Sequence, residues 1–201
     1  MQLPNDYQVM LDQQYARLAA PGTWWDGEER VAIIATMRQA RQGVFETSQR
    51  LGDLVSGFIH KVAVNAHEID ESYVKAAGEF MTPLQLVELT ALVAQFSALD
   101  TFLHAAGLDP RALPESIAGE PTKLEVKGAK LMQGWFPTRG TAGAPNCFSA
   151  VADEHKALHD IHSAIYLSME EMADLSVVKD LHRSQIELLA ARTSNYNDCF
   201  Y

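Results

Sequence analysis

The sequence predicts an all-α protein, and three observations lead to that fold class. Apolar residues recur at helical spacing along most of the 201-residue chain, and no convincing run of strand alternation interrupts them. Two segments carry strong helix-start signals, one at Asp26 and one at Thr82. An apolar share of 47% with 21% charged residues is ordinary globular composition, which excludes the disordered and fibrous classes.

The first clear helix is expected to begin after Asp26. Glu29 stands three residues later, so the two side chains can form a capping box, and the apolar pattern continues toward Arg41. Shorter helices are expected over 54–68 and 72–80, where glycines punctuate the pattern.

A long helix is expected to follow Thr82. The segment Thr82-Pro83-Leu84-Gln85 combines a threonine cap, a proline at the first helical position and a glutamine at the third. Gly107 is expected to end this helix in a left-handed conformation. Asp100 and His104 fall on its apolar face, four residues apart, and a buried hydrogen bond between them is expected.

Residues 109–146 read as a linker between two helical units. This segment of 38 residues holds five of the eight prolines and five of the twelve glycines. Trp135 and Phe136 are expected to pin it to one of the units. The predicted domains are therefore an N-terminal unit over 1–108, the linker, and a C-terminal unit over 147–201.

Two helices are expected after the linker, one over 148–165 and a final one from Asp180 toward Asn197. The apolar pattern of residues 30–35 resembles that of residues 185–190, so the two units are expected to be related copies, the first of them degenerate.

The net charge and the hydropathy of the chain argue against nucleic acid and membrane as partners. Sixteen Lys and Arg against 26 Asp and Glu give a net charge of −10, which repels nucleic-acid phosphates, and no basic run offsets it. The most apolar window, 84–103, still carries Gln85, Glu88, Gln95 and Asp100, so no membrane span is expected. The first residues lack the features of a signal peptide, and a cytoplasmic location is expected.

The end of the chain carries the most specific motif. Glu187 precedes Cys199 by twelve residues. The two residues lie in the segment Gln185-Ile186-Glu187-Leu188-Leu189-Ala190-Ala191-Arg192-Thr193-Ser194-Asn195-Tyr196-Asn197-Asp198-Cys199-Phe200-Tyr201. This segment resembles the signature of the carboxymuconolactone decarboxylase and alkylhydroperoxidase D-like superfamily. Residues 86–108 look like the long helix that follows the active-site helix in that family. Residues 24–46 resemble a first copy, with Gly43-Val44-Phe45-Glu46 where some relatives have Cys-x-x-Cys.

The resemblance implies a thiol-based, peroxiredoxin-type activity toward organic hydroperoxides. Glu187 would be the proton-relay carboxylate and Cys199 the thiol that resolves a sulfenic acid as a disulfide. The attacking cysteine of the family would be residue 202 and its histidine residue 206, and the sequence ends at Tyr201. The resemblance also implies a dithiol reductant and homo-oligomers, with no haem, flavin or metal.

Three explanations are open for the position after Tyr201. The sequence is a fragment, or the copy is degraded and inactive, or a UGA codon for selenocysteine at residue 202 is taken as a stop. The alternative to an enzyme is therefore a catalytically inactive structural or oligomeric relative. Cys147 could instead resolve Cys199 from 52 residues away, although a buried, inert thiol is the preferred interpretation.

A third class of function rests on histidines. His155, His159 and His162 follow Glu154 at a spacing that places imidazoles on one helix face, as a metal site requires. Because His155 and His162 share the register of the apolar stripe, packed neutral histidines are preferred over metal ligands.

Overall fold

The computed structural model describes residues 3–132, 134–141 and 143–196. The chain divides into two compact units, which we call unit 1 (Met1–Ile165) and unit 2 (Tyr166–Tyr201). Across the described residues, all regular structure is helical apart from two pairs of two-residue strands, so the predicted all-α class is confirmed.

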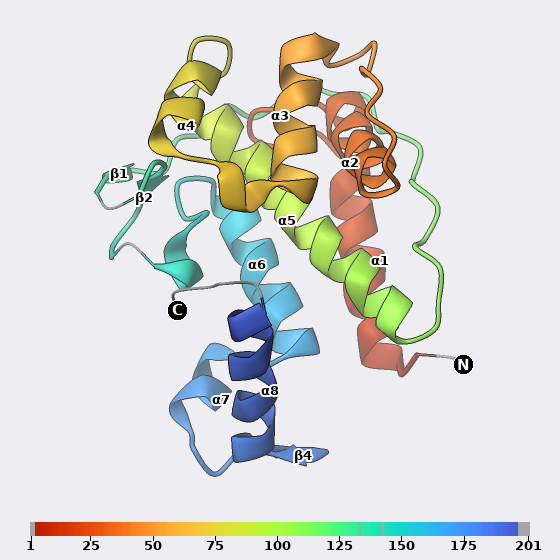
Figure 1. The fold of residues 1–201 in the computed structure, drawn as a ribbon, viewed down its shortest axis with the longest axis vertical. Helices are drawn as coiled ribbons and strands as arrows, with labels where there is room; N and C mark the ends of the chain where they lie inside the picture. Colours follow the sequence, from red (N-terminus) through yellow and green to blue (C-terminus); the bar gives the residue numbers. More distant parts are fainter. Residues whose placement is uncertain (1–2, 133, 142, 197–201) are drawn as a thin grey trace. The chain divides into compact units, whose positions relative to one another are not determined.

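Six α-helices form unit 1 (Figure 1). They are α1 (Asn5–Ala19), α2 (Gly27–Arg41), α3 (Gly52–Val64), α4 (Glu71–Ala77), α5 (Pro83–Ala105) and α6 (Ala152–Ile165), with short 3-10 turns at Ala66–Glu68 and Ala144–Asn146.

The predicted start signals of α2 and α5 are confirmed. The Asp26 side chain accepts a hydrogen bond from the Glu29 backbone, and the Glu29 side chain accepts one from the Asp26 backbone. Thr82 and Gln85 form the equivalent capping box at α5. The chain leaves α5 through Gly107 at φ 71°, a left-handed conformation that glycine adopts without strain.

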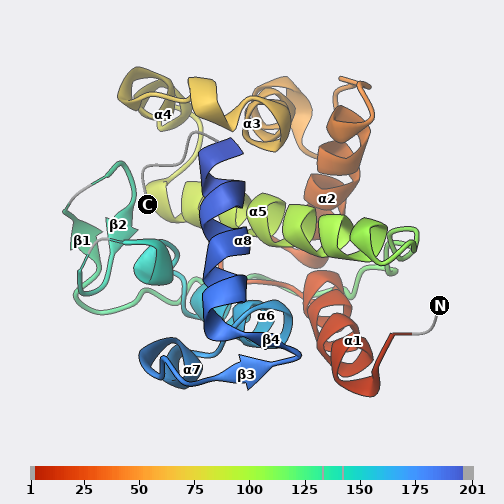
Figure 2. The ribbon, with the colours of Figure 1, turned by 60° about the horizontal axis from the view of Figure 1, so that its bottom comes forward.

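The core of unit 1 is built around α5. Figure 2 shows this helix between α3 and α6. Its apolar side chains are buried on several faces, which explains why the sequence shows no narrow apolar stripe here. By length and hydropathy α5 could also cross a membrane. However, 67% of the most apolar 18-residue stretch of this helix is buried inside the protein, as in the core helix of a globular domain.

Helix α1 was not predicted. Pro4 precedes it without a side-chain cap, so the local start signal is missing. The helix instead depends on tertiary contacts, because it packs on α2 and α6 and buries Leu11, Tyr15 and Leu18.

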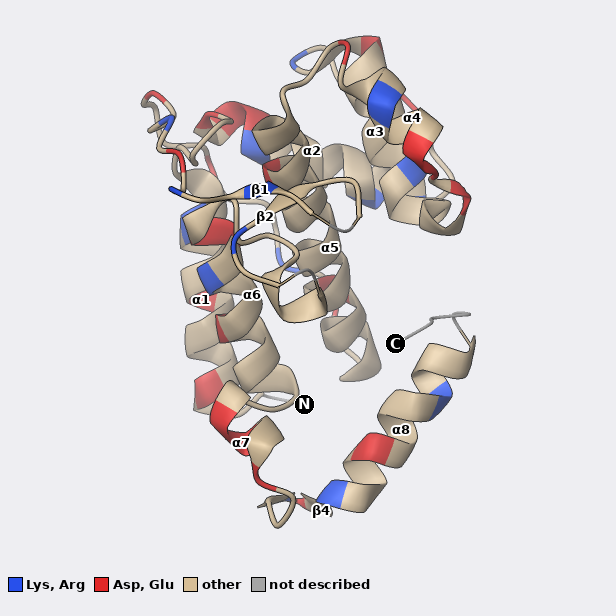
Figure 3. Cartoon of the chain, turned by 90° about the vertical axis from the view of Figure 1, so that its left-hand side faces the viewer, with Lys and Arg blue, Asp and Glu red and all other residues tan. Residues whose placement is uncertain are grey.

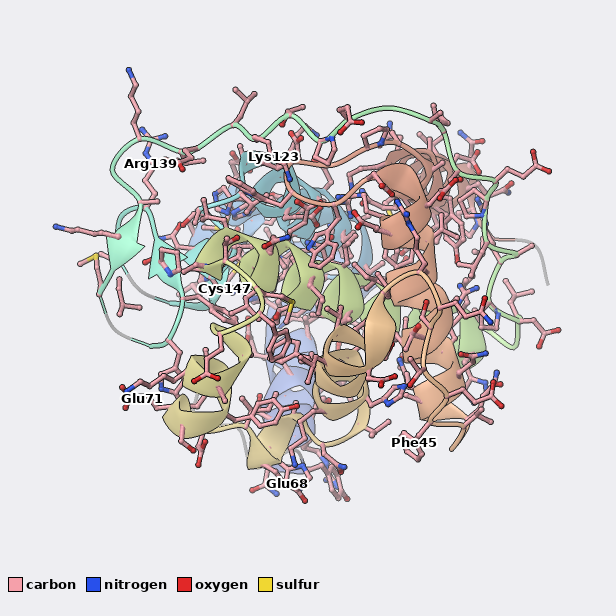
Figure 4. The ribbon with its side chains drawn as sticks, turned by 90° about the horizontal axis from the view of Figure 1, so that it is seen from above. Phe45, Glu68, Glu71, Lys123, Arg139 and Cys147 are labelled. Atoms are coloured by element: carbon pink, nitrogen blue, oxygen red, sulfur yellow. The ribbon has the colours of Figure 1, made fainter. Side chains whose placement is uncertain are left out.

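The linker lies along unit 1 and is bonded to the loop between α1 and α2. Thr122 and Lys123 donate backbone hydrogen bonds to Gly22 and Thr23 at 3.1 and 2.9 Å. Strands β1 (Lys130–Leu131) and β2 (Pro137–Thr138) form an antiparallel pair. Figure 4 marks both ends of this stretch, Lys123 and Arg139. Phe136 packs against the core as expected, and Trp135 is 45% exposed.

The boundary between the two units lies later than the predicted one. Helix α6 was assigned to the C-terminal unit 147–201, yet it packs on α1 and α5 and belongs to unit 1. The segment 109–146 therefore does not separate two units; it connects α5 to α6 within unit 1. The physical reason is burial: Ile161 enters the main core, and Glu154 is fully buried beside two arginines.

Unit 2 contains α7 (Met169–Ala173), a hairpin of β3 (Val178–Lys179) and β4 (Leu181–His182), and α8 (Arg183–Tyr196). Asp180 does not open the last helix as predicted. It occupies the hairpin turn at φ 55°, a conformation that aspartate tolerates better than most residues, and α8 begins three residues later.

Candidate functional site

The most unusual chemistry of unit 1 lies in its interior, where four charged side chains meet. We call Arg17, Arg30, Glu88 and Glu154 the buried ionic cluster; they come from α1, α2, α5 and α6. The side chains of Glu88 and Glu154 are fully buried and that of Arg30 is 1% exposed. Glu88 and Asp100 are the acidic residues of α5, which has no Lys or Arg, and most of this helix is tan in Figure 3.

Arg30 binds both carboxylates of the cluster. Its Nη1 donates to Glu88 Oε1 and, at 3.2 Å, to Glu154 Oε1. Trp24 holds the other oxygen, because its backbone N–H donates to Glu88 Oε2 at 2.6 Å. The Glu88 carboxylate therefore joins α5 both to α2 and to the loop that precedes α2.

Arg17 closes the network on its far side. Its Nη1 donates to Glu154 Oε1 at 2.5 Å and its Nη2 to Gln95 Oε1 at 2.7 Å. Gln95 in turn donates to the backbone carbonyl of Glu154 at 2.9 Å. Two guanidinium groups thus balance two carboxylates, which is the arrangement that makes buried charges tolerable.

Burial dominates the protonation of Glu88. The pKa of this carboxyl is raised to about 7: removal from water is the largest cause, Arg30 opposes it, and the neighbouring carboxylate of Glu154 adds to it. A carboxyl with a pKa near neutrality can give or take a proton at physiological pH, which is the property required of a general acid or base.

The backbone at Gly22 approaches this cluster closely. A Cβ atom at this position would lie 2.0 Å from Glu88 Oε1 and 2.1 Å from Arg30 Nη1. We therefore expect Gly22→Ala to force the two side chains apart and to destabilise the protein by about 1–3 kcal/mol, measured by chemical denaturation. Gly57→Ala is the matched control, since a Cβ there meets no atom within 4 Å. Equal stability of the two variants would contradict the close approach.

Family models, curated proteins and solved structures give no match to this chain.

Glu187, the predicted relay carboxylate, lies on α8 as expected, but it is not buried. Its side chain is 47% exposed, whereas the family resemblance implies a buried glutamate at this position, so that implication is wrong for this residue. Two groups contact Oε1: Arg183 Nε donates to it at 2.7 Å and the Tyr166 hydroxyl at 3.2 Å. Arg183 is itself held by backbone carbonyls of Glu171 and Asp174, so the Glu187 carboxylate is anchored to the end of α7.

Of the two cysteines, only Cys147 lies among the described residues. Cys199, the predicted resolving thiol, lies outside the described residues. Cys147 is a half-buried free thiol next to the short helical turn before α6, and burial raises its pKa (Figure 4). A thiol of this kind is held in its unreactive protonated form, which agrees with the preferred interpretation of an inert Cys147.

The histidines of α6 do not form a metal site. Among the described residues, no three His, Cys, Asp or Glu side chains converge as metal ligands. Glu154 points to Arg17 and Arg30 instead. The rings of His155 and His159 contact each other edge to face at 4.5 Å, and burial together with His159 lowers the pKa of His155. This is the behaviour of a packed, neutral imidazole at His155.

Asp100 is paired with an arginine and not with His104. Arg38 donates to both carboxylate oxygens of Asp100 at 2.8 Å and also to the Tyr15 hydroxyl at 2.7 Å. His104 is exposed, so the predicted Asp100–His104 hydrogen bond is wrong. Arg38, on α2, occupies both carboxylate oxygens of Asp100 on α5.

The local sequence around Glu88 resembles that around Glu187. Val87-Glu88-Leu89 on α5 matches Ile186-Glu187-Leu188 on α8, and Asp100 follows Glu88 by the same twelve residues that separate Glu187 from Cys199. Because α5 continues without a break, twelve residues span about 18 Å there. The spacing alone therefore does not bring two side chains together.

Proposed function

We propose that this protein is a thiol-based hydroperoxide reductase related to alkylhydroperoxidase D. The observation that carries the proposal is the Glu187–Cys199 motif on and after α8, with Glu187 held by Arg183 and Tyr166. The proposal includes a cytoplasmic location, a dithiol as reductant and no resident cofactor.

The proposed reaction has two steps. The attacking thiolate or selenolate, which the resemblance to the family implies at residue 202, attacks the outer oxygen of the hydroperoxide, the O–O bond breaks, and the leaving alkoxide takes a proton from the relay that contains Glu187. The Cys199 thiol then attacks the resulting sulfenic or selenenic acid, and water leaves as the S–S or Se–S bond forms. An external dithiol reduces this bond and is itself oxidised to a disulfide.

Tyr166 and Arg183 are the neighbours through which Glu187 can act. The hydroxyl of Tyr166 is a proton donor in contact with the carboxylate, and Arg183 fixes the orientation of the carboxylate from one turn earlier in α8. Both contacts are made within unit 2, next to the segment that leads to Cys199.

The test is consumption of cumene hydroperoxide with dithiothreitol by the protein expressed from its own gene. We expect Glu187→Gln and Cys199→Ser each to lower the rate at least about tenfold, since each removes a proton-relay or thiol function. Glu170→Gln and Cys147→Ser are the matched controls, and both should retain the parent rate. No turnover in the parent protein, or a loss with Cys147→Ser but not with Cys199→Ser, would contradict the proposal.

A second candidate function is that of a structural, oligomeric relative without catalysis. In the described part of unit 2, large apolar side chains are exposed on α8, with Leu188 at 62%, Leu189 at 57% and Tyr196 at 77%. Exposed apolar surface of this kind favours association with further copies. Sedimentation velocity tests it: a monomer at micromolar concentration, combined with peroxide turnover, would exclude this candidate.

A further inference from the structure

The loop between α1 and α2 lies directly against the buried ionic cluster. Residues 20–25 form this loop, and the Trp24 backbone N–H donates to Glu88 Oε2 at 2.6 Å. A Cβ atom at Gly22 would lie 2.0 Å from Glu88 Oε1, so the main chain there contacts the carboxylate with no side chain between them. The loop is therefore part of what removes Glu88 from water.

A second segment, residues 117–123, is bonded to this loop; we call it the strap. Three backbone N–H groups of the strap donate to carbonyls at 19–23: Ile117 to Ala19 at 2.7 Å, Thr122 to Gly22 at 3.1 Å and Lys123 to Thr23 at 2.9 Å. The Lys123 ammonium adds two contacts with Trp24, because Nζ donates to its carbonyl oxygen at 3.1 Å and lies 5.2 Å from the centre of its indole ring. Trp24 is thus bonded to Glu88 through its N–H and to the strap through its carbonyl.

The strap is the weakly held side of this arrangement. Residues 109–126, all of them described, form neither helix nor strand, and every residue of the strap except Pro121 is exposed. Exposed backbone hydrogen bonds with few buried apolar contacts open at a low cost in free energy. The far end of the loop is firmly held, since Trp25 is 5% exposed and its indole donates to the Gln85 carbonyl at 3.1 Å. The strap and residues 20–24 can therefore separate from Glu88 while the helices stay packed.

Opening of the loop changes the solvation of Glu88 and leaves its charged neighbours in place. These neighbours come from four elements: Arg30 on α2, Glu154 on α6, Arg17 on α1 and, on the strap, Lys123. The three that lie on helices are packed in the interior of unit 1 and do not depend on the loop for their position. What an open loop adds is water at the Glu88 carboxyl, and water favours the ionised form.

We propose that the strap and residues 20–24 form a proton-controlled cover over the buried ionic cluster, which is closed while Glu88 holds a proton and opens more readily when Glu88 is ionised. Burial raises the pKa of Glu88 to about 7 in the closed state, against 4.5 for a hydrated carboxyl. The closed state therefore binds the proton more tightly than the open one. Its advantage is complete below about pH 4.5 and is lost as the pH rises to about 7. Every residue of the cover belongs to unit 1, so the cover does not depend on the proposed peroxidase reaction.

The test is native-state hydrogen exchange, resolved by NMR at the backbone amides of Trp24 and Thr122. The exchange rate of each amide, divided by its intrinsic rate at the same pH, gives the opening constant of the cover. We expect this constant to rise by about threefold to thirtyfold between about pH 5.5 and about pH 8, where the upper value applies if Glu88 is fully hydrated in the open state. The amide of Leu92, a fully buried residue of α5, is the internal reference and should show a much smaller opening constant.

Two variants separate the parts of the cover. Glu88→Gln keeps the shape of the side chain and does not titrate, so the opening constant of Trp24 should no longer change with pH. Lys123→Met removes both contacts of the ammonium and should raise the opening constants of Trp24 and Thr122 together, about fivefold at each pH. Lys123 is exposed, so this variant tests the coupling even where Glu88→Gln lowers stability. Lys127→Met is the matched control, because Lys127 lies beyond the strap, and both constants should stay at the parent values.

Four results would overturn the proposal. An opening constant that does not change with pH in the parent, or that changes equally in Glu88→Gln, would leave Glu88 without control over the cover. Equal opening constants for Trp24 and Leu92 would mean that the loop is released only when the whole unit unfolds. A rise at Thr122 without a rise at Trp24 in Lys123→Met would mean that the strap moves without the loop.

Discussion

Arg30→Ala is expected to lower the free energy of unfolding by about 3–5 kcal/mol, the largest single loss that we expect in this protein. Arg30 is 1% exposed and binds the buried carboxylates of Glu88 and Glu154. Removing the guanidinium leaves those two groups facing each other in an apolar interior, with Arg17 alone to balance them. Chemical denaturation at pH 7 measures the loss.

The control for this prediction is Arg50→Ala. Arg50 also pairs with carboxylates, those of Asp26 and Glu28, but its side chain is 47% exposed, and water and salt screen such pairs. We expect no measurable change in stability. The double variant Arg30→Met/Glu88→Gln should recover part of the loss, because it removes a charge together with its partner. Equal effects of Arg30→Ala and Arg50→Ala would mean that burial does not control the energetics of the cluster.

The elements that sequence reasoning located are those whose signals are local. The capping boxes of Asp26 with Glu29 and of Thr82 with Gln85 span four residues each and satisfy free N–H groups of the helix start, whatever the rest of the chain does. The structure accordingly begins both helices where the sequence predicts them.

The elements that it missed depend on contacts between distant residues. Helix α1 lacks a capping signal and is fixed by burial against α2 and α6. The assignment of α6 to unit 1 follows from the pairing of Glu154 with Arg17, 137 residues earlier in the chain. Neither pairing can be inferred from hydrophobic periodicity, which describes one helix at a time.

Contacts between distant residues also explain why the buried carboxyl could not be located from the sequence. The resemblance makes Glu187 the relay carboxylate, but the carboxyl that is buried and has a raised pKa is that of Glu88. Both residues stand between two aliphatic residues of a helix, Glu88 between Val87 and Leu89 and Glu187 between Ile186 and Leu188. What differs is the surroundings: α5 is enclosed by other helices of unit 1, whereas Glu187 is half-exposed. Desolvation is a property of the folded unit, and a local motif does not encode it.

Glu88 is expected to make the stability of the protein fall as the pH rises from about 4.5 to about 7. Its pKa is about 7 in the folded protein against a usual value of 4.5, so in this range the folded state holds a proton that the unfolded state has released. Below pH 4.5 both states are protonated and the contribution is complete; above pH 7 it is lost. The difference between the two pKa values corresponds to about 3 kcal/mol in the free energy of unfolding.

Glu88→Gln isolates this contribution, because glutamine keeps the shape of the carboxyl and does not titrate. The stabilities of the parent and variant proteins are measured by urea denaturation at pH 5 and pH 7.5, and the change between the two pH values is compared. Carboxyls whose pKa values are lowered by their partners, such as Glu68 and Asp70, act in the opposite direction but contribute equally to both proteins. We expect the parent to lose about 2 kcal/mol more than the variant between pH 5 and pH 7.5, because part of the contribution is already lost at pH 5. If the two proteins respond identically, Glu88 ionises in the folded state as it does in water, and the helices around it do not exclude solvent from the cluster.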